Sequence, residues 1–135
     1  MNRRQVGADY EQAACDYLVS CGFRIVVRNY RCRSGEIDIV AREEVRMPYG
    51  EPTDYLVFTE VKYRADESRA GGPLAAVNRR KQQRIFRTAV HYLLENGMPE
   101  TTPVRFDVVG ITPGGIQLVR DAFHISSSAG RRRIR

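Results

Sequence analysis

The chain contains few of the residues that hold metal ions through sulfur or imidazole. Its 135 residues include three cysteines and two histidines, and no two cysteines have the Cys-x-x-Cys spacing. Structural zinc sites usually take four Cys or His ligands, and pairs at that spacing are common among them. We therefore expect no zinc site and interpret Cys15, Cys21 and Cys32 as reduced thiols that pack as small side chains.

Long apolar stretches are also missing. A membrane-spanning helix needs ~20 consecutive apolar residues, and no stretch of this sequence approaches that length. The N-terminus begins with a polar, helix-like segment rather than an apolar signal. We expect a soluble, cytoplasmic protein without a membrane partner.

Basic charge is the main feature of the composition. The chain has 22 Lys and Arg residues against 16 Asp and Glu residues, which gives a formal net charge of +6. A net positive charge favours binding to polyanionic partners such as nucleic acid. The hydrophobic content of 42% is enough for one core but not for a second domain. We expect a single domain over residues 1–125 and a disordered, arginine-rich tail over residues 126–135.

The spacing of apolar side chains predicts both helices and strands. Helices are expected where apolar residues recur with helical spacing, over residues 6–21 and 74–96. Strands are expected where β-branched and aromatic residues gather, over residues 23–30, 36–42, 55–63, 104–112 and 116–119.

The connections between these elements predict the fold class. Residues 43–54 include Pro48, Gly50 and Pro52 and predict a long exposed link between antiparallel strands. A helix separates the third and fourth strands, so these two can be parallel neighbours, while the first three strands form a meander. We expect an α/β fold in which a mixed central sheet has an αβββαβ core and helices on both faces.

A charged pair ends the strand at 55–63. Successive side chains of a strand point to opposite faces, so Glu60 and Lys62 share a face with the apolar Phe58. A charge at the end of a core face is costly unless it is paired or binds a metal. Two interpretations stay open: an ordinary salt bridge at the edge of the core, or a catalytic pair.

The link at 43–54 suggests a partner for Glu60. If the two strands pair around a midpoint near residue 49, Asp38 faces Glu60, whereas a slip of two residues brings Lys62 or Phe58 opposite Asp38. Opposed carboxylates lie ~5 Å apart and repel each other unless they share a cation. Mg²⁺ or Mn²⁺ between Asp38 and Glu60 would suit phosphodiester hydrolysis, with Lys62 beside the metal. Glu11, on the first helix, is either a third acid of this site or a solvent-facing side chain.

Basic and aromatic side chains provide candidate contacts with nucleic acid. The second predicted helix has a basic side that either tracks phosphates or is simply solvated, and it consists of Arg79, Arg80, Lys81, Arg84 and Arg87. Three tyrosines either stack on unpaired bases or, as we favour, pack within the protein: Tyr30, Tyr55 and Tyr63.

Four segments together resemble the bacterial YraN family. They are Gly-Glu-Ile-Asp-Ile-Val-Ala at 35–41, Leu-Val-Phe-Thr-Glu-Val-Lys-Tyr-Arg at 56–64, Ala-Val-Asn-Arg-Arg-Lys at 76–81 and Arg-Phe-Asp-Val-Val at 105–109. The resemblance runs from about Gly7 to Phe123. It implies a restriction-endonuclease-like fold, similar in its core to archaeal Holliday-junction resolvases. The catalytic pattern of that fold falls on Glu11, Asp38, Glu60 and Lys62.

The resemblance implies a Mg²⁺- or Mn²⁺-dependent endonuclease that cuts DNA. A branched DNA substrate and a homodimer are further expectations of the same resemblance. The alternatives are a nucleic-acid-binding protein of this fold without turnover and a structural or partner-binding protein. Residues 46–53 look like an insertion relative to the family, at the mouth of the expected site.

Overall fold

The computed structural model describes residues 3–65 and 77–124. The expected tail at 126–135 lies outside the described residues, and so does the start of the helix expected from residue 74. The described elements are α1 (Arg3–Ser20), β1 (Arg24–Cys32), β2 (Gly35–Val45), β3 (Thr53–Tyr63), α2 (Arg79–Glu95), β4 (Val104–Thr112) and β5 (Gly115–Val119).

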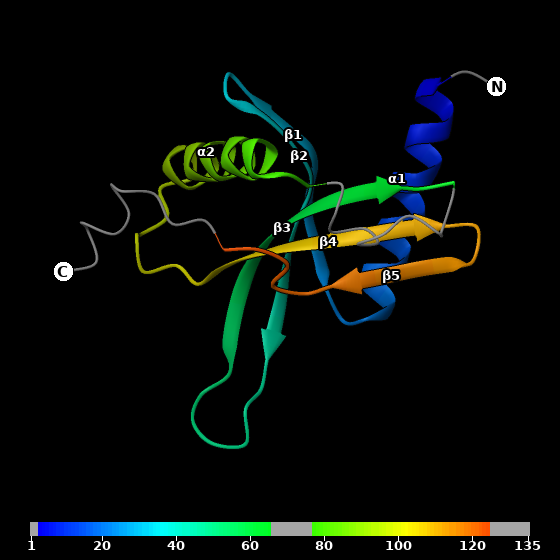
Figure 1. Ribbon diagram of the computed structural model, residues 1–135. Helices are drawn as coiled ribbons and strands as arrows, with labels where there is room; N and C mark the ends of the chain where they lie inside the picture. Colours follow the sequence, from blue (N-terminus) through cyan, green and yellow to red (C-terminus); the bar gives the residue numbers. More distant parts are fainter. Residues whose placement is uncertain (1–2, 66–76, 125–135) are drawn as a thin grey trace.

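The strands form one mixed sheet in the order β1-β2-β3-β4-β5 (Figure 1). β3 and β4 are parallel, and the other neighbouring pairs are antiparallel. The predicted α/β class, the three-strand meander and the parallel pairing of the third and fourth strands are therefore confirmed. None of the described helices combines the length and apolar character that crossing a membrane requires.

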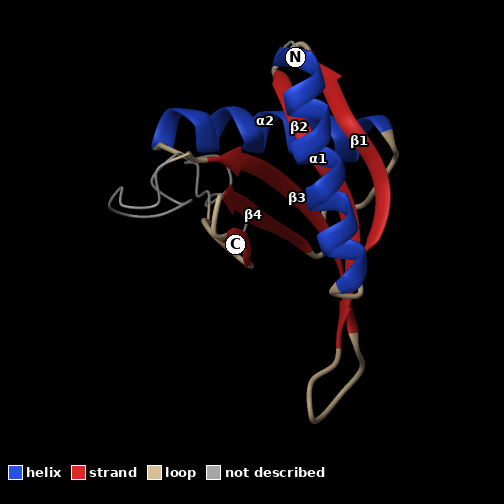
Figure 2. Cartoon of the chain, turned by 90° about the vertical axis from the view of Figure 1, so that its right-hand side faces the viewer, coloured by secondary structure: helices blue, strands red, loops and turns tan. Residues whose placement is uncertain are grey.

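The two helices cover opposite faces of the sheet. In Figure 2, α1 runs in front of the strands and α2 passes behind them. One core cluster joins α1 to the sheet through residues that include Leu18, Ile39 and Val57. The other joins α2 to the sheet and includes Phe58 and Ile85. The predicted helices on both faces are confirmed.

The helix ends follow local capping chemistry. Gly22, with φ of 98°, stops α1, and the Phe23 amide donates back to the Leu18 carbonyl over 3.0 Å. Asn78 is extended and its side chain accepts the Lys81 amide at 2.9 Å, which sets the start of α2. Among the described residues, the expected helix is wrong at residues 77 and 78, because this cap makes Arg79 the first residue of α2.

The β2–β3 hairpin is longer than expected. The two strands reach Val45 and start again at Thr53, so the exposed connection shrinks from 43–54 to 46–52. Glu43 accounts for part of the difference, since it is 8% exposed and pairs with the buried Arg105 of β4 and with Arg120, which follows β5.

The predicted hairpin register is confirmed over the pairs from Ile39 with Thr59 to Val45 with Thr53. Side chains of a strand normally alternate between the two faces of its sheet, and β2 departs from this rule at one point. Ile37 and Val40 both pack on the α2 side, although two residues separate them, whereas Ile39 packs on the α1 side. This irregularity lies at Asp38.

Candidate functional site

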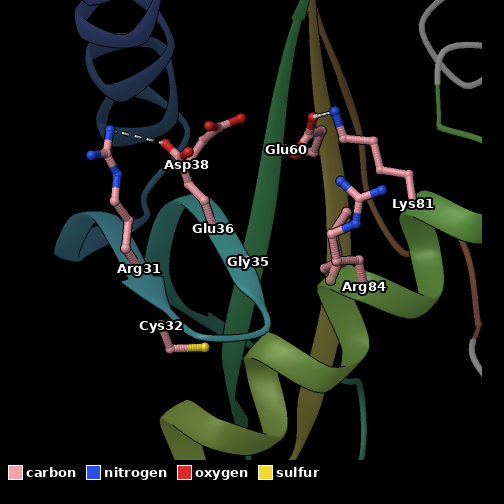
Figure 3. A pocket seen from close by; sticks show the side chains of 9 residues that line it. Arg31, Cys32, Gly35, Glu36, Asp38, Glu60, Lys81 and Arg84 are labelled. Atoms are coloured by element: carbon pink, nitrogen blue, oxygen red, sulfur yellow. Dashed lines mark ion pairs between the residues drawn. The ribbon is translucent and has the colours of Figure 1, made fainter.

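Glu60 is a buried acid that two lysines contact. It is 7% exposed, and its Oε2 lies 2.8 Å from Lys81 Nζ and 3.2 Å from Lys62 Nζ. Figure 3 shows Glu60 on β3 and Lys81 on α2 pointing toward each other. The predicted pairing of Glu60 with Lys62 is present, and Lys81 adds a second ammonium that the strand pattern did not predict.

The electrostatics of the two lysines differ. Burial lowers the pKa of each ammonium group. At Lys81 the contacts with Glu60 and Lys62 and the negative charges of Glu60 and Asp38 together outweigh burial and raise the pKa. At Lys62 burial, together with the neighbouring Lys81, holds the pKa below its usual value. Lys81 is therefore the more firmly charged partner of Glu60.

Asp38 lies one residue beyond the last β2–β3 ladder pair, Ile39 with Thr59. Its Oδ2 accepts the amide hydrogen of Val61 at 2.8 Å. The carboxylate thus continues the contact between the strands where backbone pairing ends. Burial raises the pKa of Asp38 to about 7, and the charge of Glu60 adds to the rise, although the Val61 hydrogen bond opposes it. The Glu60 carboxylate is therefore close enough to disfavour the ionisation of Asp38.

A cavity of about 590 Å³ opens between β2, β3 and α2. Three acids line it, Glu36, Asp38 and Glu60, and so do the basic side chains of Arg31, Lys81 and Arg84. Figure 3 shows basic side chains reaching the acids from both sides of the cavity. Arg31 pairs with Glu36 at 3.7 Å, and Lys81 pairs with Glu60.

Glu11 approaches Asp38 from the α1 side of the sheet. Its Oε1 accepts hydrogen bonds from Asn29 at 2.7 Å and Arg28 at 3.3 Å. It lines a second cavity, of about 440 Å³, which also includes Asp38 but not Glu60. Of the predicted site residues, the structure brings together Asp38, Glu60 and Lys62 and leaves Glu11 on the α1 side.

Comparison with known proteins places the chain in a family. The sequence profile of "Uncharacterised protein family UPF0102" matches residues 10–111. The chain belongs to UPF0102. This confirms the YraN-like resemblance, and because the family is uncharacterised, membership supplies no activity.

Similar UPF0102 proteins occur in several organisms. A UPF0102 protein of Lachnoclostridium phytofermentans is 48% identical over 123 residues, covering 91% of this chain and 96% of that protein. One from Chloroflexus aurantiacus is 41% identical over 128 residues, covering 95% of each chain. One from Nitrosococcus oceani is 41% identical over 128 residues, covering 92% of this chain and 95% of the relative.

The donor set of this UPF0102 chain fits a hard divalent cation held by two carboxylates. Mg²⁺ keeps several waters and commonly takes one or two protein carboxylates. Asp38 and Glu60 supply such a pair, and their mutual repulsion is what a cation between them would relieve. Within residues 3–65 and 77–124, no group of three His, Cys, Asp or Glu side chains is arranged to hold a metal ion.

The predicted basic face of α2 divides into three parts. Lys81 and Arg84 line the cavity beside Asp38 and Glu60. Arg79 and Arg80 are exposed at the start of the helix. Arg87 lines a different, more apolar cavity next to β4. Lys81 and Arg84 are thus the two basic residues of α2 that lie next to the paired acids.

The three tyrosines that the sequence singles out, Tyr30, Tyr55 and Tyr63, differ in their surroundings. Tyr30 packs edge-on against Tyr92 and donates its hydroxyl to Glu95 at 2.7 Å. Tyr55 lies under the Arg105 guanidinium. The favoured packing role holds for these two, while Tyr63 is 37% exposed.

A buried ionic cluster was missed by the sequence reasoning. The Arg105 guanidinium donates to Asp107 at 2.8 Å and to Glu43 at 2.6 Å. Arg120 also donates to Glu43, at 2.8 Å, and Asp107 is fully buried. The Arg-Phe-Asp sequence at 105–107 places Arg105 and Asp107 on one face of a strand, so their ion pair could have been predicted. The residues around Glu43 in the sequence do not identify it as their partner.

Proposed function

We propose that the protein is a Mg²⁺- or Mn²⁺-dependent endonuclease of the restriction-endonuclease-like fold that hydrolyses DNA phosphodiester bonds. One observation carries the proposal. Two acids from neighbouring strands, the half-buried Asp38 and the buried Glu60, line one cavity together with Arg31, Lys81 and Arg84. That cavity combines cation ligands with groups that neutralise a phosphate.

In this proposal Asp38 and Glu60 would hold the divalent cation. When bound, such a cation polarises a phosphoryl oxygen and lowers the pKa of a coordinated water. Asp38 must be ionised to act as a ligand, and the Val61 amide helps to hold its carboxylate in that form. Both side chains come from strands rather than loops, so the sheet fixes their separation.

The basic residues would position the phosphodiester. Lys62 and Lys81 both contact Oε2 of Glu60 and so fix the orientation of its carboxylate. Arg84, on the same side of the cavity as Lys81, can donate two parallel hydrogen bonds to phosphate oxygens. Charge that develops on the phosphate in the transition state would meet donors already in place.

The arrangement of elements also supports the proposal. A helix acid, a strand Asp and Glu-x-Lys on the next strand are the pattern that the family resemblance implies. Here α1 carries Glu11, β2 carries Asp38 and β3 carries Glu60 with Lys62. A homodimer acting on branched DNA belongs to the same proposal, since two copies would supply one site for each strand to be cut.

A cleavage assay tests the proposal. Duplex, flap and four-way-junction DNA are incubated with the protein and Mg²⁺ or Mn²⁺, and the products are resolved on denaturing gels. We expect Glu60→Gln to lower the cleavage rate by about 100-fold or more, as loss of a major electrostatic group does in other enzymes. Glu51→Gln, at an exposed position in the 46–52 connection, is the matched control. The proposal fails if no substrate is cut or if Glu60→Gln cuts as fast as the unmodified protein.

A second candidate is a nucleic-acid-binding protein without turnover. Two observations favour it. Both lysines contact Glu60, so its charge is already paired without a metal ion. Glu11 is hydrogen-bonded to Asn29 and lines the cavity that does not include Glu60, so it is not gathered with the other acids around one ion. A pure binder would hold DNA equally well with EDTA and with Mg²⁺. Its affinity would fall linearly with salt on a double logarithmic plot, and no product would form.

A further inference from the structure

The second cavity, on the α1 side, adjoins the acid pair. It has a volume of about 440 Å³, within the range of small-molecule sites. It shares three lining residues with the cavity on the α2 side, namely Arg31, Glu36 and Asp38. A bound polynucleotide that passes Asp38 can therefore reach both cavities at once.

An aromatic pair forms part of this second cavity. The rings of Tyr10 on α1 and Tyr63 on β3 stack with centroids 4.2 Å apart and an angle of 8° between their planes. Both residues line the cavity, and Tyr63 remains 37% exposed. Strand alternation places Tyr63 on the α1 side, directly after Lys62 on the α2 side. The exposed part of Tyr63 offers a ring on which another planar group can stack.

The charges of the two cavities differ. On the α1 side the lining residues include three carboxylates, from Glu11, Glu36 and Asp38, and one cation, Arg31. Arg28, which does not line the cavity, pairs with Glu11, and the carboxylates still outnumber the cations. On the α2 side Lys81 and Arg84 join Arg31. A phosphate is therefore favoured on the α2 side and repelled on the α1 side. The acids on the α1 side are not arranged as a three-ligand metal site within the described residues.

A neutral planar group with hydrogen-bond donors fits these properties. We propose that the α1-side cavity binds an unpaired nucleobase, stacked on Tyr63, next to a phosphate held on the α2 side. The carboxylates and Asn29 are acceptors for donor groups on the base edge. A base inside a duplex cannot leave its stack without an energetic cost, so the preferred substrate carries an unpaired nucleotide beside the contacted phosphate. The phosphate's position rests on the proposed function.

Binding of a fluorescent base tests this inference without cleavage. A short single-stranded DNA carrying one 2-aminopurine is titrated with protein in EDTA, and the same DNA with an abasic position in its place is compared by anisotropy. The chain contains no tryptophan, so the protein contributes little fluorescence at the probe's excitation. We expect quenching on binding and an affinity about tenfold higher for the base than for the abasic strand.

Three variants assign the effect to Tyr63. Tyr63→Leu removes the aromatic face and should lose the quenching and about tenfold in affinity. Tyr63→Phe keeps the ring and should behave as the unmodified protein. Tyr49→Leu, at a tyrosine that is 91% exposed, is the matched control. Circular dichroism melting of each variant reports whether it is folded.

The inference is overturned if the unmodified protein binds the abasic strand as tightly as the 2-aminopurine strand. It is also overturned if folded Tyr63→Leu quenches normally, or if Tyr49→Leu loses as much affinity as Tyr63→Leu. The outcome is separable from that of the cleavage assay. Base-dependent binding with no metal-dependent product would support the base site and reject the nuclease. Cleavage without base-dependent binding would support the nuclease and reject the base site.

Discussion

Asp38 carries the clearest electrostatic cost among the residues of the proposed site. Burial and the neighbouring charge of Glu60 raise its pKa to about 7. Below about pH 4 the carboxyl is protonated in both the folded and the unfolded chain. Between about pH 4 and 7 the unfolded chain releases this proton while the folded chain keeps it, so Asp38 lowers the stability progressively as the pH rises.

Asp38→Asn should remove this pH dependence. The amide oxygen of the new side chain can still accept the Val61 amide hydrogen, but the side chain cannot ionise. We expect the free energy of unfolding of the variant, relative to the unmodified protein, to increase by about 4 kcal/mol between pH 4 and pH 8. Urea unfolding at both pH values, in EDTA, measures it. Asp54→Asn, where the side chain is 47% exposed, is the control, and an unchanged pH slope in Asp38→Asn would contradict the assignment.

Gly35 has a structural role at the edge of the site. Its φ is 152°, and a Cβ there would lie 3.1 Å from Cγ of Arg84 and 3.2 Å from Oγ1 of the buried Thr88. The absence of a side chain therefore lets α2 approach the start of β2 and brings Arg84 to the cavity. Glycine satisfies both the backbone angle and the close approach.

Gly35→Ala should cost about 2 kcal/mol of stability, because it combines backbone strain with a packing clash. The comparison is with Gly115→Ala, where φ is 142° but no atom lies within 4 Å of the added Cβ. The difference between the two variants in chemical denaturation isolates the clash with α2. Equal losses would show that the contact with Arg84 and Thr88 is unimportant.

The paired acids could be predicted from sequence for a simple reason. Strand alternation puts Glu60 and Lys62 on one face, and pairing of the two strands around a midpoint near residue 49 puts Asp38 opposite Glu60. Both inferences depend on short, regular periods of the sequence. Lys81 was predicted only as a phosphate contact. Its approach to Glu60 depends on how α2 docks on the sheet, which no local period of the sequence encodes.

At the level of the elements, Arg105 connects β2, β4 and the segment after β5. Its guanidinium bonds Glu43 of β2 and Asp107 of β4, and Asp107 in turn accepts the amide of Asp121 at 2.9 Å. Arg105 also lies over the rings of Phe23 and Tyr55. Burial of this arginine is tolerated because its donors are paired on both sides.

Arg105→Met should destabilise the fold by about 3 kcal/mol, because it leaves buried carboxylates without their cation. Arg42→Met provides the contrast, since Arg42 pairs with the half-exposed Asp54 at 3.3 Å and should cost under about 1 kcal/mol. Urea denaturation of both variants gives the two values. Similar losses in the two variants would show that the buried cluster is no stronger than a surface pair.

The same cluster explains why the hairpin was predicted too short. Pro48, Gly50, Pro52 and the charged residues around them are typical of a loop, and the chain does form a loop at 46–52. The sequence predicts Glu43 as a loop residue because a lone glutamate normally lies in solvent. Its partners are 62 and 77 residues away, so only the folded chain shows that it belongs to the sheet.

At the level of the whole molecule, the sheet separates two kinds of surface that meet at Asp38. The α2 face contributes the lysines and Arg84, and the α1 face contributes Glu11 and the stacked tyrosines. The net charge of +6 favours approach of a polyanion, while the local acids select where a cation and a phosphate can lie. The fold class was predictable from the order of the elements, whereas this division of the surface depends on the break in side-chain alternation of β2 at Asp38.

The central claim is that Asp38 and Glu60 hold one divalent cation. The most direct test is a crystal structure of the protein grown with Mn²⁺, with anomalous diffraction measured at the manganese edge. We expect a single anomalous peak within bonding distance of both carboxylates, and its loss in Glu60→Gln crystals. A peak elsewhere, or no peak between Asp38 and Glu60 while both lysines remain on Glu60, would contradict the account.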